Sequence, residues 1–296
     1  MKLVTFEQGG KARPGIWLGD KVIDIAAADG GKLGLDSMLA FIAAGEKALA
    51  AAKGWAASPP AGATIDAKAV KLLAPIPRPT KNVFCIGRNY LDHVKEGHEV
   101  RGTAVDLPKA PQIFTKPPTA VIGPDAEASA AKSVTAAFDY EVELGVIIGK
   151  KARDISKDQV FDHIFGYTVV NDLTARDLQS LHGQWFRGKG LDTSCPIGPW
   201  IVTKDEIADV GKLELTCTVN GERRQNATVD MMIFDIPTIV STLASGMTLE
   251  PGDIIATGTP AGVGFAMKPP KLLNEGDVVV CEVSQIGALK TTIRRP

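Results

Sequence analysis

The sequence predicts an α+β protein that is mostly β, with a small N-terminal α/β domain in front of a larger one. Strand-like apolar runs dominate after Thr80, whereas helical patterns are few and do not alternate regularly with the strands. Two proline-containing segments with few apolar residues, SPPAGAT and PIPRPTK, separate the beginning of the chain from the rest. We therefore expect domains at residues 1–77 and 78–296.

The N-terminal domain is expected to combine a small sheet with helix. Its predicted strands are KLVTF, PGIWL and KVIDI, and Gly19-Asp20 is typical of a tight hairpin turn. An alanine-rich stretch then predicts a helix that runs to about Lys53, with Asp36 as its N-cap.

The larger domain is expected to contain most of the strands. The predicted strands are NVFCIG, PQIFTK, TAVIG, YEVELGVIIG, FGYTVV, LELTCTV, DIIATG and DVVVCEV. Asn220-Gly221 predicts a hairpin between two of these runs. Two helices are expected, one in SKDQVFDHI with Ser156 as its cap, and one in FDIPTIVSTLAS with Asp235 as its cap and Pro237 in the first turn.

Composition excludes several classes of function. The 33 basic and 34 acidic residues give a net charge of −1, which favours neither nucleic acid nor a membrane surface as a partner. No apolar run reaches the ~20 residues of a membrane span, and the N-terminus has no signal core of ~7–15 apolar residues. We expect a cytoplasmic protein with four reduced cysteines, since these are scattered without metal-ligand spacing.

The segment FDYEVELGVIIG carries the most informative pattern in the chain. A strand would place Asp139, Glu141 and Glu143 on one face, where three buried acids would repel each other and resist desolvation. A divalent cation would resolve both problems, and Asp172, at the end of the apolar run YTVVND, offers a third oxygen ligand. Such all-oxygen ligation suits Mg²⁺ or Mn²⁺. Alternatively, the acids protect a solvent-facing sheet edge, and Asp172 serves as a turn or cap residue.

Two further segments offer groups for acid–base chemistry and charge stabilisation. His93 and Glu96 would share one face of a helical turn, where the carboxylate fixes the imidazole tautomer and raises its basicity. The alternative is an ordinary surface pair, and His98 ranks lower because it lacks an acid at the same forward spacing. Lys189 lies between glycines, which suits either a cation delivered to the site or a solvated lysine. The polar stretch KEGHEVRGTAVDL is a possible mobile lid.

The turn TGTPAGVG, at residues 257–264, follows a predicted strand. Its backbone N–H groups and Thr259 are suited to gripping a carboxylate, although an ordinary connection between strands fits as well. The turn lacks the GK[ST] ending of a phosphate loop and the following helix of a dinucleotide site. The chain also has no G-x-S-x-G elbow and no HExxH motif, and Cys195 is interpreted as structural.

Taken together, these segments resemble the fumarylacetoacetate hydrolase superfamily. The segments that carry the resemblance lie in roughly residues 80–296 and are GRNYLDHVKE, DYEVELGVIIGK, GYTVVNDLTARDLQ, WFRGKGLDTSCPIGP, VNGERRQ, LEPGDIIATGTPAGVG and EGDVVVCEV. The resemblance implies a mixed β-roll catalytic domain behind a smaller N-terminal domain, in a homodimer.

The resemblance also implies the roles of individual residues. The implied metal ligands for Mg²⁺ or Mn²⁺, with Ca²⁺ as a substitute in crystals, are Glu141, Glu143 and Asp172. The implied catalytic residues are His93, Glu96 and Lys189, and the implied substrate-binding residues are Arg88, Gln179 and Thr259.

The implied substrate is a small 2-oxo or 2,4-dioxo acid. The principal expectation is hydrolysis of the C3–C4 bond of an acylpyruvate, which gives pyruvate and a carboxylic acid. Decarboxylation of oxaloacetate and keto–enol isomerisation are the alternatives, because all three reactions share an enolate that a metal and Lys189 would stabilise. A non-enzymatic rival is a protein that keeps a structural cation on the carboxylate strand.

Overall fold

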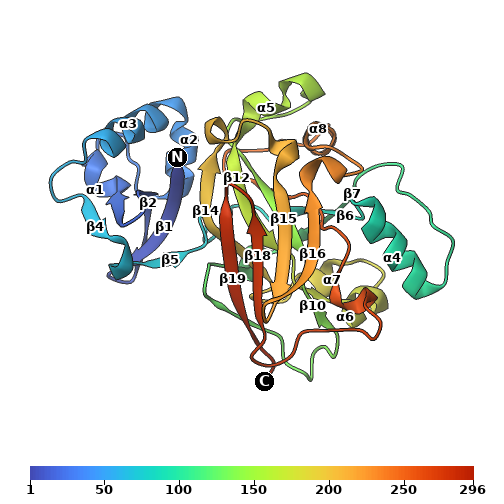
Figure 1. The fold of residues 1–296 in the computed structure, drawn as a ribbon. Coiled ribbons are helices and arrows are strands. Elements are labelled where there is room, and N and C mark those ends of the chain that lie inside the picture. The colour runs from blue at the N-terminus through green and yellow to red at the C-terminus, as the bar shows by residue number, and fades with distance from the viewer.

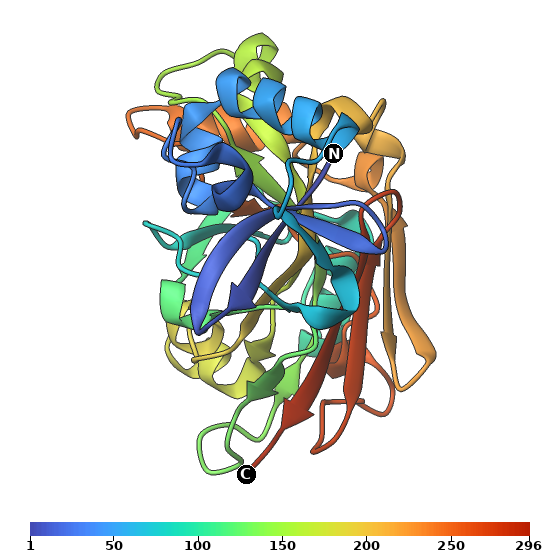
Figure 2. The ribbon, with the colours of Figure 1, turned by 90° about the vertical axis from the view of Figure 1, so that its left-hand side faces the viewer.

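The computed structural model describes residues 1–296, and its N-terminal part forms a small layer of helices on a sheet (Figures 1 and 2). The strands of this part are β1 (Lys2–Gln8), β2 (Lys11–Trp17), β3 (Lys21–Asp24), β4 (Thr64–Asp66) and β5 (Lys71–Leu73). Its helices are α1 (Ile25–Asp29), α2 (Met38–Ala44) and α3 (Glu46–Ala57). The three strands predicted before residue 25 are confirmed, as is the turn between β2 and β3.

The predicted alanine-rich helix differs from the structure in its cap and its continuity. Ser37, not Asp36, is the N-cap, and its side chain accepts a hydrogen bond from the Ala40 N–H. Gly45 then divides the stretch into two helices, since its φ of 57° and ψ of −128° do not continue a helix. The second helix continues to Ala57, beyond the predicted end at Lys53.

The larger part contains most of the strands and the remaining helices. Its first strands are β6 (Val83–Gly87), β7 (Gln112–Lys116), β8 (Val121–Ile122), β9 (Glu127–Ser129), β10 (Phe138–Asp139), β11 (Val142–Ile148) and β12 (Ile164–Asn171). They are followed by β13 (Thr174–Ala175), β14 (Cys195–Thr203), β15 (Glu214–Val219), β16 (Glu222–Thr228), β17 (Ile254–Ala256), β18 (Val278–Val283) and β19 (Gly287–Arg294). The helices are α4 (Leu91–Arg101), α5 (Val160–His163), α6 (Arg176–Leu181), α7 (Phe186–Lys189) and α8 (Ile236–Ala244).

Two large sheets organise these strands. A 12-stranded sheet has the order β4-β3-β2-β1-β14-β12-β11-β17-β6-β7, with β5 beside β1 and β8 beside β14. A five-stranded sheet has the order β16-β15-β18-β19-β9, and β10 and β13 form a short pair. Most pairs are antiparallel, but β17 with β6, β14 with β8 and β19 with β9 are parallel. The predicted mixed, mostly β, α+β fold is thereby confirmed.

Local signals in the larger part are also confirmed. Asn220 and Gly221 have φ values of 52° and 81°, which suit the hairpin that joins β15 to β16. The Asp235 side chain caps α8 by accepting from the Thr238 N–H, with Pro237 in the first turn. Ser156 caps the short 3₁₀ turn that leads into α5.

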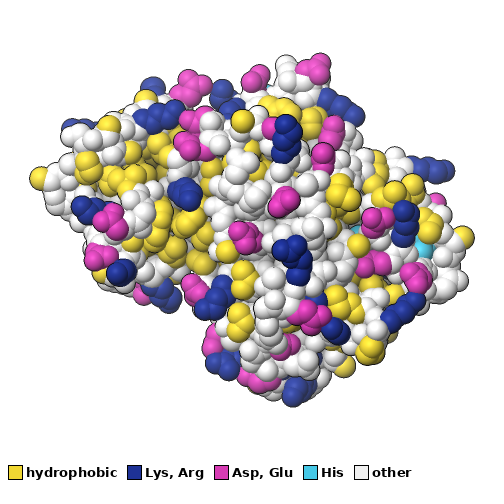
Figure 3. All heavy atoms as spheres, viewed as in Figure 1, with side chains coloured by type: hydrophobic (Ala, Val, Ile, Leu, Met, Phe, Trp, Pro, Cys, Tyr) yellow, Lys and Arg dark blue, Asp and Glu magenta, His cyan; other side chains and the backbone are white.

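The two parts share a sheet and a core. Strand β1 pairs with β14, so the N-terminal sheet continues directly into the larger part. One cluster of 37 buried residues lies in the larger part alone, whereas a second cluster of 25 draws side chains from both parts. Figure 3 shows further hydrophobic side chains on the visible surface of the N-terminal part. The division of the chain into domains at residues 1–77 and 78–296 stays a prediction.

The structure contains no helix long and apolar enough to span a membrane. All four cysteines are free and buried. Burial raises the pKa of the Cys195 thiol to about 12, which is consistent with its interpretation as a structural residue.

Candidate functional site

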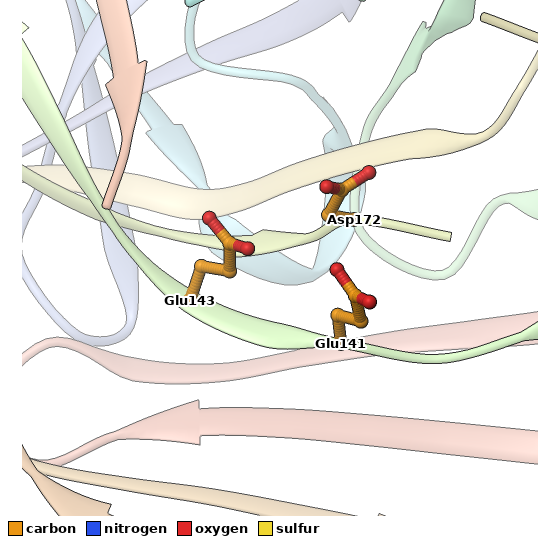
Figure 4. Close-up of side chains that lie close together, drawn as sticks. All are labelled: Glu141, Glu143 and Asp172. Carbon is orange, nitrogen blue, oxygen red and sulfur yellow. The ribbon is translucent and has the colours of Figure 1, made fainter. Parts of the chain in front are cut away.

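Three carboxylates from two neighbouring strands lie together in the interior. Glu141 precedes β11, Glu143 lies within it, and Asp172 directly follows β12, whose Asn171 is paired with Val142. The Asp172 N–H donates to the Glu141 carbonyl at 2.9 Å, which fixes the two strand ends side by side. Each carboxylate offers an oxygen within 4.8 Å of the others, and all three point into the same space (Figure 4). The alternative of a solvent-facing edge is wrong, since none of the three is more than 4% exposed.

Two buried lysines accompany these carboxylates. The Lys189 ammonium lies 2.7 Å from both Glu141 Oε2 and Asp172 Oδ2, and the Lys116 ammonium lies 2.7 Å from Asp172 Oδ1. Lys189 ends α7 and is only 2% exposed, so it is not a solvated lysine. Lys116 ends β7 and is fully buried. The charge of Asp172 is thus shared between two ammonium groups.

Arg176 links the site to the beginning of the carboxylate strand. Its Nη1 lies 2.6 Å from Glu141 Oε1, and its Nε lies 2.9 Å from Asp139 Oδ2. Asp139 also accepts a hydrogen bond from the Gly264 N–H at 2.8 Å. Asp139 therefore neutralises and orients Arg176, and Arg176 in turn fixes one oxygen of Glu141.

Glu143 differs from its neighbours because it has no cationic partner. Its Oε2 accepts a hydrogen bond from the Gly258 N–H at 2.8 Å. Burial, followed by the charges of Asp172 and Glu141, raises the pKa of the Glu143 carboxyl well above its usual range. Burial also opposes ionisation of Glu141, but Lys189, Arg176 and His93 together hold the pKa of Glu141 far below its ordinary value.

The backbone N–H groups of the turn at residues 257–264 bind carboxylates, as expected, but these carboxylates belong to the protein itself and not to a ligand. Its N–H donors and their carboxylate acceptors are Gly258 with Glu143, Gly262 with Glu96, and Gly264 with Asp139. The Thr259 hydroxyl accepts from Gln225 Nε2 at 2.8 Å, and Gln225 Oε1 in turn accepts from a backbone N–H of β11 at 3.0 Å. One turn thus positions acids from three different elements.

His93 and Glu96 form a hydrogen-bonded pair on α4. His93 Nδ1 donates to Glu96 Oε1 at 2.7 Å, because an ionised carboxylate only accepts. The other oxygen of Glu96 accepts from the Gly262 N–H at 2.9 Å. This arrangement leaves His93 Nε2 free to exchange a proton. His98 is not part of the pair, since its ring contacts Arg88 and Thr103 instead.

These groups surround one cavity of about 460 Å³. Seven of the nine predicted site residues line it, namely Arg88, His93, Glu141, Glu143, Gln179, Lys189 and Thr259. Asp172 and Glu96 lie behind the lining, each bonded to a lining residue. The first half of the predicted lid is the ordered helix α4, which forms one wall of the cavity.

Sequence analysis missed two cations of the site, Lys116 and Arg176. Lys116 ends a strand in which buried and exposed side chains do not alternate regularly. The sequence pattern therefore gave no sign that its ammonium group is buried. Arg176 lies four residues after Asp172 in the segment NDLTARD, and a basic residue so near a candidate metal ligand was the available signal.

The donor set fits a divalent cation. The triad supplies only carboxylate oxygens, its members are buried and close, and the Oε1 atom of Glu143 has no hydrogen-bond partner in the protein. Hard oxygen ligands of this kind suit Mg²⁺ or Mn²⁺. A cation would also offset the cost of ionising Glu143 in the interior.

Comparison with known proteins gives consistent matches along the chain. Residues 82–294 match the family described as fumarylacetoacetate (FAA) hydrolase C-terminal. The chain is 44% identical over 304 residues to oxaloacetate tautomerase YisK of Bacillus subtilis, covering 99% of this chain and 100% of that protein. It is 39% identical over 295 residues to mitochondrial oxaloacetate tautomerase Fahd2a of Rattus norvegicus, covering 98% of this chain and 90% of that protein.

Solved structures give the same result. A fumarylacetoacetate hydrolase from Exiguobacterium antarcticum is 39% identical with a TM-score of 0.83, and all of both chains is covered. A maleylpyruvate hydrolase from Sphingobium is 30% identical with a TM-score of 0.81, again over all of both chains.

Proposed function

The chain belongs to the fumarylacetoacetate hydrolase family, and on that premise we propose that it is an enzyme that interconverts the keto and enol forms of oxaloacetate. The observation that carries the proposal is that His93, whose Nε2 has no hydrogen-bond partner in the protein, lies in the same cavity as a carboxylate triad that could hold a metal ion. The full-length similarity to oxaloacetate tautomerases favours isomerisation over the hydrolysis that we expected first from the sequence.

We assign a separate role in proton transfer to each of three residues of the site. His93 Nε2 removes a proton from C3 of the keto form, and the electron pair of that C–H bond becomes the C2–C3 double bond of an enolate. The C2 oxygen then takes up a proton to give the enol. Glu96 holds the ring in the tautomer with Nε2 free and stabilises the imidazolium formed. Lys189 supplies positive charge to the C2 oxygen as it becomes anionic.

A divalent cation held by Glu141, Glu143 and Asp172 would act as a Lewis acid that polarises the 2-oxo group. Lys116 contacts Asp172 and Arg176 contacts Glu141, each through the carboxylate oxygen that Lys189 does not contact, and they orient these carboxylates. The preferred ion, a cytoplasmic location and homodimerisation stay predictions.

The proposal is tested by following two signals from one reaction mixture. Enol absorbance reports tautomerisation of oxaloacetate, and NADH oxidation by coupled lactate dehydrogenase reports pyruvate. We expect Mg²⁺-dependent acceleration of enol–keto exchange that EDTA removes, with little pyruvate. If the enzyme accelerated exchange equally well without metal, the proposed metal site would be contradicted. If metal stabilised the protein but no turnover were seen, the result would favour a non-enzymatic protein with a structural cation.

Hydrolysis of a 2,4-dioxo acid is the second candidate. The paired His93 and Glu96 fit activation of water for attack on a 4-carbonyl, and a maleylpyruvate hydrolase shares the fold over its whole length. Rapid pyruvate release from acylpyruvates, without acceleration of oxaloacetate exchange, would replace the first proposal with this one.

The role of His93 is tested by His93→Ala. We expect kcat to fall by about 10²–10⁴, the usual contribution of a general base, while Mg²⁺ binding measured by calorimetry is retained. His163→Ala is the matched control, since His163 bonds the Gln159 carbonyl outside the cavity. Wild-type rates in His93→Ala would refute the assignment.

A further inference from the structure

The cavity contains two arginines without an acidic partner. Arg176 and Lys189 are paired with carboxylates, but no carboxylate lies within 4.0 Å of the side-chain nitrogens of Arg88 or Arg101. Arg88 Nη2 contacts His98 Nε2 at 2.9 Å and the Asp106 carbonyl oxygen, neither of which is a carboxylate. The guanidinium of Arg101 makes no hydrogen bond or ion pair within the chain, although Arg101 lines the cavity.

Helix α4 directs Arg101 toward the reacting end of the cavity. His93, Gly97 and Arg101 are spaced by four residues and therefore form one stripe of the helix, which faces the cavity. The distance along the helix from His93 to Arg101 is about 12 Å at 1.5 Å per residue. A Cβ at Gly97 would lie 3.4 Å from Arg101 Nη1, so the guanidinium folds back over the glycine toward His93.

The charges at this end of the cavity are unbalanced. Burial, together with the nearby charges of Arg88 and Arg176, lowers the pKa of Arg101, and no acid opposes the effect. The carboxylates of the site are instead paired with Lys116, Lys189 and Arg176. Arg88 and Arg101 therefore lack a compensating negative charge in the cavity, and a bound anion would supply it.

We propose that Arg101, together with Arg88, binds the second carboxylate of a 2-oxo dicarboxylic acid and makes the enzyme selective for dicarboxylates over 2-oxo monocarboxylates. This inference rests on the proposed function and deepens it. A guanidinium fork matches a carboxylate with two parallel hydrogen bonds. Arg101 is exposed, as expected for a group that meets the substrate at the mouth of the cavity.

The first test compares oxaloacetate with its 4-methyl ester, which keeps the 2-oxo acid end but lacks the second charge. We expect wild type to prefer the dicarboxylate. In Arg101→Gln, kcat/KM for oxaloacetate should fall about 10- to 100-fold, mostly through KM, whereas the ester should change less than about threefold. Arg101→Lys should recover part of the preference. Equal losses on both substrates, or no loss on either, would overturn the assignment.

A binding test separates this inference from the proposed function. Calorimetry with Mg²⁺ compares oxaloacetate with pyruvate, so it needs no turnover. Arg101→Gln should weaken oxaloacetate binding about tenfold or more and leave pyruvate binding unchanged. Lys95→Gln is the control on the same helix, because Lys95 is paired with Asp92 and lies outside the cavity. Unchanged oxaloacetate binding in Arg101→Gln would refute the inference, whatever reaction the enzyme catalyses.

Discussion

At the scale of single residues, the site depends on how its buried charges are neutralised. Glu141 and Asp172 are each bonded to two cations, whereas Glu143 has only a backbone N–H. Ionising an unpaired carboxylate in the interior costs several kcal/mol. Glu143 is therefore the ligand whose ionisation depends most on a bound cation.

Glu143→Gln tests this dependence through the effect of pH. The pKa of Glu143 is raised in the folded protein, so the stability it contributes is fully present below the ordinary Glu pKa and is lost as pH rises through the raised value. In EDTA, the Tm of wild type should decline more steeply than that of Glu143→Gln as the pH rises above the ordinary Glu pKa. The exposed Glu282→Gln is the control, and it should follow wild type. Parallel curves for wild type and Glu143→Gln would contradict the prediction.

Lys116→Met tests the buried ion pair with Asp172. Both side chains are fully buried, so the variant leaves Asp172 with only Lys189, and breaking a buried pair costs about 3–5 kcal/mol. We expect that loss in the metal-free free energy of unfolding, measured with urea, and partial recovery with Mg²⁺. Lys290→Met, which removes a pair with Asp125 on the surface, should cost less than about 1 kcal/mol. Equal losses of unfolding free energy in the two variants would show that the buried pair stabilises the protein no more than the surface pair does.

Spacing within one element was enough to predict two pairs of site residues. The period of a strand brought Glu141 and Glu143 to one face, and a helical turn paired His93 with Glu96. Lys116 could not be predicted in this way, because it meets Asp172 across 56 residues of sequence. Contacts between distant segments depend on strand order, which local periodicity does not contain.

At the scale of elements, the turn at residues 257–264 holds acidic side chains of the protein, whereas the sequence led us to expect a loop that binds a substrate carboxylate. The sequence predicted N–H groups that bind a carboxylate, and the structure identifies the carboxylates as those of the protein. Strand and cap signals predicted most elements correctly, whereas the alanine-rich helix was divided by the backbone conformation of Gly45.

Gly262→Ala tests the turn as a unit. Gly262 has a φ of 103°, and an added Cβ would lie 2.0 Å from the Arg224 carbonyl oxygen. Backbone strain and overpacking together should destabilise the protein by about 2–4 kcal/mol. Movement of the Gly262 N–H would also release Glu96, so kcat should fall at temperatures where the variant is folded.

The control is Gly246→Ala, at a φ of 70° with open space around the added Cβ. It should cost about 1 kcal/mol and leave kcat unchanged. If Gly262→Ala retained full activity, the turn would not position the His93–Glu96 pair.

At the scale of the whole molecule, the proposed boundary at residues 77–78 does not coincide with a break in the packing. Phe41 of α2 packs edge-on against Phe165 of β12 with ring centroids 6.3 Å apart, and β1 extends the sheet of the larger part. Prolines and composition led us to predict this boundary, but a shared core depends on contacts between segments far apart in the chain, which composition does not reveal.

Because the two parts share a core, the chain should unfold in one cooperative transition, with calorimetric and van't Hoff enthalpies in agreement. Phe41→Ala tests this directly. Phe41 is fully buried, so the substitution should cost about 3–5 kcal/mol and move the whole transition to lower temperature, including loss of the catalytic site. Phe161→Ala is the control, since that ring is 42% exposed, and it should shift the transition far less. An early, separate transition in Phe41→Ala, with the site still able to bind Mg²⁺, would show instead that residues 1–77 unfold on their own.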